Sequence, residues 1–93
     1  MSEMARAEIN VWGNVQGVGF RYFTTQHAKR LGVRGYVQNV PGGDRVRAVV
    51  EGNESRIEDL YAEMRRGPAS GSVERHDIAW GAPTGEFDGF NVR

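Results

Sequence analysis

The sequence predicts an α+β fold in which a mostly antiparallel sheet carries two helices on one face. The first observation is that apolar spacing changes repeatedly between strand-like alternation and helical spacing, in the order βαββαβ with a small final strand. The second is that no linker, repeat or low-complexity segment interrupts this order. Because 93 residues suffice for one core, we expect a single domain over residues 1–93, with residues 1–5 flexible.

The pattern begins with a strand, a glycine-rich loop and a helix. Ala7, Ile9 and Val11 alternate with more polar neighbours, which predicts a strand with one buried face. Apolar residues then recur at helical spacing from Phe20 to Leu31, and the glycine at position 32 is the kind of residue that ends a helix.

A hairpin and a second helix follow. Residues 35–39 form a short strand and residues 41–44 a turn, and the returning strand buries Val46, Ala48 and Val50. The second helix has Asn53 or Ser55 as its N-cap and ends at Gly67, and its apolar face consists of Ile57, Leu60, Tyr61 and Met64.

Two further strands, at residues 73–80 and 87–92, complete the pattern, with a turn at residues 81–85 between them. This order suggests two split βαβ units that form one sheet. The expected architecture is therefore the ferredoxin-like α+β sandwich.

The loop from Gly13 to Arg21 has the composition of an anion-binding site. Its glycines let backbone N–H groups turn inward, and the N-terminus of the following helix adds partial positive charge at the same point. Arg21 can bind two oxygens of a phosphate at once. The structural alternative for such a loop is a tight connection between a strand and a helix.

The strand order brings one distant side chain toward this loop. The first two strands flank the third and are antiparallel to it, so their C-terminal ends emerge at the same edge of the sheet. Asn39 closes the second strand and shares a face with Val37, which should point at the helices. We therefore expect Asn39 near the start of the first helix.

Composition excludes several classes of function. Twelve basic and twelve acidic side chains give a formal net charge of zero, so nothing in the composition attracts nucleic acid or an anionic membrane. Cysteine is absent and His27 and His76 lack the spacing of paired metal ligands, so we expect no metal and no cofactor. With no apolar run that could span a bilayer, we expect a cytoplasmic protein, and with no obvious extra apolar surface we expect a monomer.

At these residues the chain closely resembles the acylphosphatase family. The two signatures are GNVQGVGFR at residues 13–21 and GYVQN at residues 35–39, and the likeness extends to residues 67–68 and 90–92. One departure is the spacing from Gly43 to Val46, which is one residue longer than the usual pattern. We expect this to lengthen the hairpin turn and to leave the chemistry unchanged.

The resemblance implies hydrolysis of acyl phosphates to carboxylate and inorganic phosphate by direct attack of an oriented water, without metal or phosphoenzyme. It implies that Arg21 and Asn39 are catalytic and that Asn39 orients the water. It also implies that inorganic phosphate is both product and competitive inhibitor. The phosphate-binding residues would be Val15, Gln16, Gly17, Val18, Gly19, Phe20 and Arg21.

The residues that the chain lacks agree with such a substrate. A carboxylate leaving group, whose conjugate acid has a pKa of about 4, departs without being protonated. No general acid is then required, whereas an ordinary phosphomonoester expels a far more basic alkoxide. Positioning and charge stabilisation suffice for an activated phosphate.

Two other functions share the predicted layout. RNA-recognition modules have the same element order, and Arg34-Gly35-Tyr36 resembles the opening of their aromatic motif, but the match breaks at Val37 and falls on the wrong strand. The other alternative is an inactive interaction domain of the same fold, against which the intact Arg21 and Asn39 argue.

Overall fold

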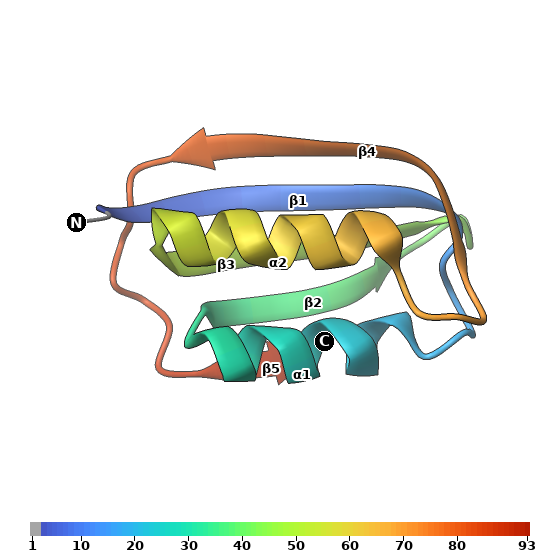
Figure 1. Ribbon diagram of the computed structural model, residues 1–93, viewed down its shortest axis with the longest axis horizontal. Coiled ribbons are helices and arrows are strands. Elements are labelled where there is room, and N and C mark those ends of the chain that lie inside the picture. The colour runs from blue at the N-terminus through green and yellow to red at the C-terminus, as the bar shows by residue number, and fades with distance from the viewer. Residues whose placement is uncertain (1–2) are drawn as a thin grey trace.

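The computed structural model describes residues 3–93. Both helices lie on one face of the sheet (Figure 1). Within this range the elements are β1 (Met4–Asn14), α1 (Phe20–Leu31), β2 (Arg34–Val40), β3 (Arg45–Asn53), α2 (Glu54–Arg66), β4 (Ser72–Gly81) and β5 (Phe90–Val92).

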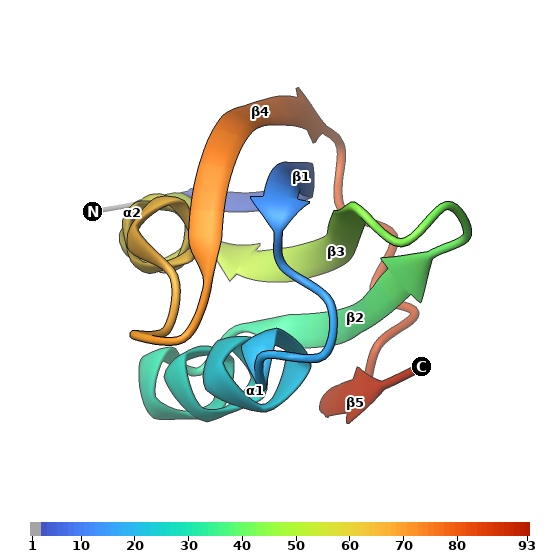
Figure 2. The same cartoon turned by 90° about the vertical axis from the view of Figure 1, so that its right-hand side faces the viewer.

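The sheet has the strand order β4-β1-β3-β2-β5. The pairs β1–β3, β1–β4 and β2–β3 are antiparallel, and only β2–β5 is parallel. Figure 2 shows the sheet nearly end-on, with the loop from β1 to α1 facing the viewer. The predicted ferredoxin-like fold is confirmed, and β1 and β2 run parallel on either side of β3.

The last predicted strand, residues 87–92, is wrong at its start, because β5 begins only at Phe90. Residues 82–89 are not a strand but cross from β4 at one edge of the sheet to β5 at the other. The reason is that Phe87 packs its ring edge-on against Tyr36, 6.0 Å between centroids, and pairing with β2 begins only where Gly35 N–H donates to the Gly89 carbonyl. The turn at residues 81–85 therefore does not join neighbouring strands.

The stretch expected to be flexible, residues 1–5, is described by the structure only in part. Residues 1–2 lie outside the described residues. Met4 and Ala5 belong to β1, where they pair with Asn53 and Gly52 of β3.

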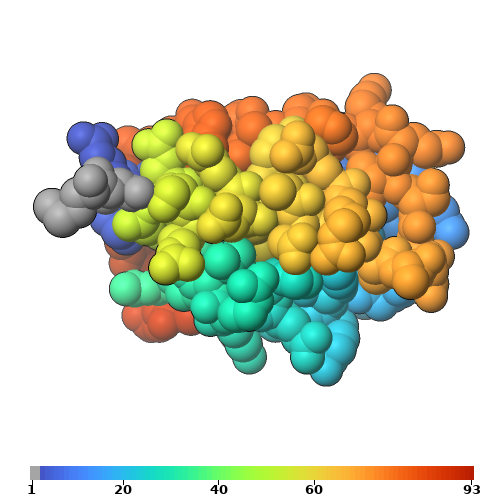
Figure 3. All heavy atoms as spheres, in the orientation of Figure 1, coloured from blue at the N-terminus to red at the C-terminus, as the bar shows by residue number. Residues whose placement is uncertain are grey.

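The core lies between the helices and the inner face of the sheet. Ile9, Val37 and Val50 from the sheet meet Phe20 and Leu60 from the helices, and all five are almost fully buried. Figure 3 shows the helices covering this face of the molecule. Because α1 is anchored by Phe20 at its first residue, the loop before it is held at one end by the core.

Candidate active site

The loop between β1 and α1 turns sharply at two glycines. Gly17 and Gly19 have φ angles of 75° and 78°, in the left-handed region that L side chains rarely adopt. A Cβ at either position would meet nothing within 4 Å. The backbone conformation, and not crowding, therefore requires glycine here.

The N-terminus of α1 is left open. Its N-cap is Gly19, which makes no side-chain cap bond, and the first turn contains no acidic residue. Within residues 3–93, no backbone N–H from positions 15–19 donates to another backbone group outside the regular elements. These donors and the helix dipole are thus available to an anion.

Arg21 lies in this first turn. Its guanidinium donates to the backbone carbonyl of Arg93, 3.2 Å away, which joins the start of α1 to the residue that follows β5. Among residues 3–93, no side-chain carboxylate lies within ion-pair distance of Arg21. Arg21 therefore has no acidic side-chain partner in this part of the chain.

Asn39 and Arg21 line one pocket of about 290 Å³, as strand order and face predicted. Asn39 comes from β2, where it pairs with Val46, and its carboxamide has no hydrogen-bond partner among the described residues. The other lining residues are Val15, Gly17, Gly19, Phe20, Tyr22, Thr25 and Val92.

Two of the predicted phosphate-binding residues, Gln16 and Val18, do not line this pocket. The Gln16 side chain instead fastens the loop to the β2–β3 hairpin. Its amide donates to the Val40 carbonyl at 2.7 Å and to the Arg45 carbonyl at 3.0 Å. Since Val40 follows Asn39, this clamp fixes the loop relative to the strand that carries the carboxamide.

Sequence analysis missed three residues of the pocket wall: Tyr22, Thr25 and Val92. Thr25 stands one helical turn after Arg21, and its hydroxyl donates to the Arg21 carbonyl at 2.7 Å. That spacing could have identified Thr25, because such residues share a helix face. Val92 carries no comparable signal, since only the pairing of β5 with β2 brings it here.

A second group of arginine and backbone N–H donors lies near the other end of β3, where it binds the protein's own Glu51. Arg6 donates to this carboxylate at 2.6 Å, and the N–H groups of Thr84 and Gly85 donate at 2.9 Å each. Burial by itself would raise the pKa of Glu51, but these hydrogen bonds outweigh it and lower the pKa to about 2.

Two further findings concern the described part of the chain. Residues 3–93 contain no group of three or more His, Cys, Asp or Glu side chains placed to hold a metal ion. Neither of the described helices is long and apolar enough to cross a membrane.

These observations define a small α+β protein with a site suited to an anion, formed by the N-terminus of α1 and by Arg21, which has no acidic side-chain partner among residues 3–93. The family model described as Acylphosphatase matches residues 7–92. The chain therefore belongs to the acylphosphatase family. This match gives no support to the RNA-recognition alternative.

Relatives and solved structures agree with this membership. The chain is 46% identical to an acylphosphatase of Anaeromyxobacter sp. (strain Fw109-5), covering 100% of this chain and 99% of the relative. It is 42% identical to an acylphosphatase of Thermococcus kodakarensis, covering 94% and 93%. The crystal structure of acylphosphatase from Bacillus subtilis superposes with a TM-score of 0.90 at 28% identity, covering 96% and 98%.

Proposed function

We propose that this chain hydrolyses acyl phosphates to a carboxylate and inorganic phosphate, with Arg21 and Asn39 as its catalytic residues. The observation that carries the proposal is that Arg21, Asn39 and two glycines of the loop line the same pocket. Membership of the acylphosphatase family supports the substrate class.

The phosphoryl group would lie against the loop, bound by N–H groups from Val15 to Phe20 and by the Arg21 guanidinium. These donors would stabilise the charge on its oxygens in the transition state without reorganising. Asn39, whose carboxamide has no competing partner among the described residues, would orient the attacking water.

The reaction needs no second substrate besides water. The water oxygen forms a bond to phosphorus while the bond from phosphorus to the acyl oxygen breaks and its electron pair leaves with the carboxylate. The protons of the water remain with the phosphate, so an acyl phosphate dianion yields one carboxylate and one dihydrogen phosphate. Because the leaving carboxylate is weakly basic, no side chain has to protonate it.

Four finer statements belong to the same proposal: the enzyme works without a metal ion, inorganic phosphate competes with substrate, the protein is monomeric, and it is cytoplasmic. Competition follows from the proposed binding mode, since phosphate would bind the same N–H groups and guanidinium. The oligomeric state and the location remain predictions from composition.

Hydrolysis of acetyl phosphate in EDTA tests the proposal. The wild type should be active, and Arg21→Ala and Asn39→Ala should each lower kcat/KM by about 100-fold or more. Arg21→Lys should also be severely impaired, because a point charge does not replace the planar guanidinium fork.

Arg30→Ala is a matched control, since Arg30 is an exposed arginine of the same helix that contacts His27. Its turnover should equal that of the wild type. An inactive wild type, dependence on an added metal ion, or full turnover in Arg21→Ala would contradict the proposal.

A further inference from the structure

The pocket extends beyond the groups that would bind the phosphoryl moiety. Tyr22, Thr25 and Val92 line it without belonging to the glycine loop, and all three are uncharged. Arg21 is the one charged residue among the described residues that line it. If the loop and Arg21 bind phosphate, this remaining wall is left to the acyl group.

Two of these wall residues are large apolar side chains that remain exposed. The exposed fraction is 67% for Tyr22 and 50% for Val92. Within residues 3–93, four large hydrophobic residues are exposed, and two of them share this one pocket; the other two are Met4 and Trp80. Exposed apolar surface that gathers at a pocket indicates binding of an apolar group.

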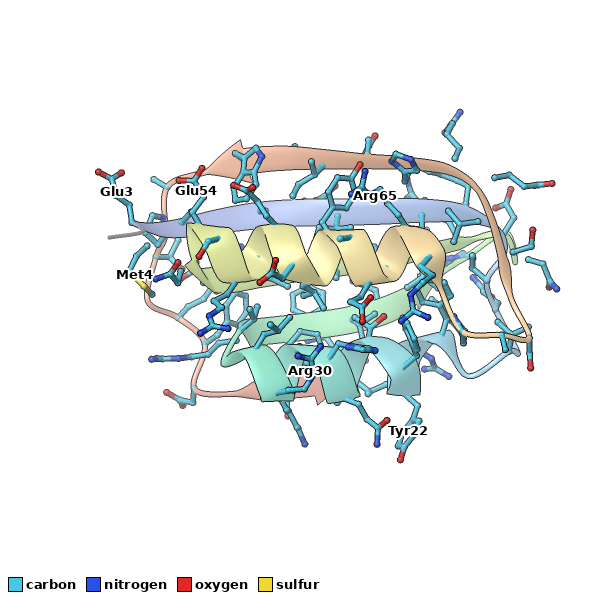
Figure 4. All side chains as sticks on the ribbon, viewed as in Figure 1. Glu3, Met4, Tyr22, Arg30, Glu54 and Arg65 are labelled. Carbon is cyan, nitrogen blue, oxygen red and sulfur yellow. The ribbon has the colours of Figure 1, made fainter. Side chains whose placement is uncertain are left out.

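The Tyr22 ring comes from α1. Figure 4 shows its side chain projecting from the helix away from the body of the molecule. The Gln26 amide, one turn later, donates to the Tyr22 hydroxyl at 2.7 Å and so satisfies its polar end. The ring is thereby tethered at the hydroxyl, which leaves its apolar part free for contact.

Val92 comes from β5. It pairs with Val37 of β2, and the next N–H, that of Arg93, donates to the Val37 carbonyl at 2.8 Å. The bond from Arg21 to the Arg93 carbonyl joins this wall to α1. The exposed apolar side chains that line the pocket therefore come from two regular elements, α1 and β5.

We propose that Tyr22 and Val92 form an acyl-binding surface that selects acyl phosphates with an uncharged, apolar acyl group, either an aromatic ring or an aliphatic chain. This inference rests on the proposed function. Because Arg21 is engaged by the phosphoryl group, an acyl group with its own carboxylate finds no cation of the lining residues to pair with it. A small polar acyl group gains little from the surface.

The test compares kcat/KM for acetyl, benzoyl and succinyl phosphate. Acetate, benzoate and succinate differ in basicity, so each substrate is also compared between the wild type and variants, where the leaving group is the same and only contacts with the acyl group change. For the wild type we expect benzoyl phosphate to exceed acetyl phosphate by about tenfold, the size of a small apolar contact, and succinyl phosphate to be the poorest.

Variants locate the preference. Tyr22→Ala should reduce the ratio of benzoyl to acetyl phosphate nearly to one, Val92→Ser should reduce it by about threefold, and Tyr22→Phe should keep it because the ring remains. Trp80→Ala and Met4→Ala remove the other two exposed apolar side chains and should leave the ratio unchanged. The inhibition constant of inorganic phosphate should be the same in Tyr22→Ala as in the wild type.

Different failures mean different things. An enzyme that hydrolyses acetyl phosphate but shows no preference for benzoyl phosphate overturns the acyl-binding surface alone. The same holds if Tyr22→Ala lowers both rates equally, or weakens inhibition by phosphate, which would place Tyr22 among the phosphate-binding groups. Wild-type protein that hydrolyses none of the three contradicts the proposed function itself.

Discussion

The molecule contains two sites that combine an arginine with backbone N–H donors. One is filled, because it binds the protein's own Glu51 carboxylate, and the other is open, because it faces a pocket. Near one end of the sheet, Arg6 and the N–H groups of Thr84 and Gly85 bind the carboxylate of Glu51. At the other end, Arg21 and the glycine loop face a pocket, and no acidic side chain among residues 3–93 pairs with that arginine. The difference separates a stabilising arrangement from one that is free to bind a substrate.

The filled site shows how strongly such an arrangement favours negative charge. Although burial opposes ionisation, the donors lower the pKa of Glu51 to about 2. The open site offers a guanidinium and backbone N–H groups as well, with a helix N-terminus in addition. The same physical chemistry that adds to folding stability at Glu51 would contribute to phosphate binding at Arg21.

The largest effect on activity should follow from placing a negatively charged side chain in the open site. Arg21→Glu places a carboxylate where the guanidinium stands, and we expect kcat/KM for acetyl phosphate to fall by about 1,000-fold or more. Thermal unfolding should change little, because a favourable interaction of about 0.3–1 kcal/mol between an acidic residue in the first turn and the helix dipole offsets the lost hydrogen bond to the Arg93 carbonyl.

Arg30→Glu, at the C-terminal end of α1, is the matched control for this change. It should leave turnover unchanged and lower stability, since the dipole has the opposite sign there. Turnover in Arg21→Glu above a tenth of the wild-type value would contradict the comparison.

Removing the negative charge of Glu51 from the filled site should lower stability and leave activity unchanged. Glu51→Gln removes the charge that Arg6 and two N–H groups bind, and we expect a loss of about 3 kcal/mol in the free energy of unfolding. Urea unfolding measures this loss. Glu86→Gln is the control, because Glu86 also binds Arg6 at 2.6 Å but is exposed, and should cost less than about 1 kcal/mol.

Acid should remove the same contribution from the wild type. Since the pKa of Glu51 falls from 4.5 to about 2, its stabilisation is complete above pH 4.5 and is lost as the pH falls from about 4.5 to about 2. The loss should reach about 3 kcal/mol. Urea titrations at several pH values should show the gap between wild type and Glu51→Gln closing over this range, and a constant gap would argue against the depressed pKa.

A smaller change tests whether the glycine loop matters through its backbone. Gly19→Ala adds only a methyl group, which would contact nothing within 4 Å. The φ angle of 78° at position 19 is nevertheless unfavourable for alanine by about 1–2 kcal/mol. We expect that loss of stability and a fall of about 30-fold in kcat/KM, because the N–H groups are redirected. Gly32→Ala, with a φ of 71° and equally open surroundings, should lose the same stability and keep its turnover.

The smallest effect should come from the second helix. Asn53 caps α2 by accepting from the Ser55 N–H at 3.2 Å, so its helix terminus is satisfied by the protein, unlike that of α1. Asn53→Ala should lower the free energy of unfolding by about 1 kcal/mol. Turnover of acetyl phosphate should not change, and a change beyond twofold would show that the two termini are not functionally distinct.

Local patterns predicted the parts of the site that depend on strand faces and helix ends. The start of α1 at Phe20 and the placement of Asn39 beside the loop follow from apolar spacing and strand order. The Glu51 site could not be predicted in this way. Glu51 looks like an ordinary polar residue of a strand, and its partners Thr84 and Gly85 lie more than 30 residues away in an irregular segment.

Sequence analysis did not predict the hydrogen bonds of Gln16 or the place of Val92 in the pocket wall, for a related reason. A glutamine in a loop gives no indication of which carbonyls it will reach. The three residues of β5 are too few to reveal their partner strand, and only the crossing of residues 82–89 brings them beside β2.

The pairing of β5 with β2 also has a consequence for biosynthesis. Arg21 and the Arg93 carbonyl that it contacts are 72 positions apart in the chain. On the ribosome the loop, Arg21 and Asn39 therefore emerge well before the strand that closes their pocket. A nascent chain that has not yet released residues 90–93 has the glycine loop but lacks the part of the pocket that Val92 lines, so the pocket is complete only once β5 has joined β2.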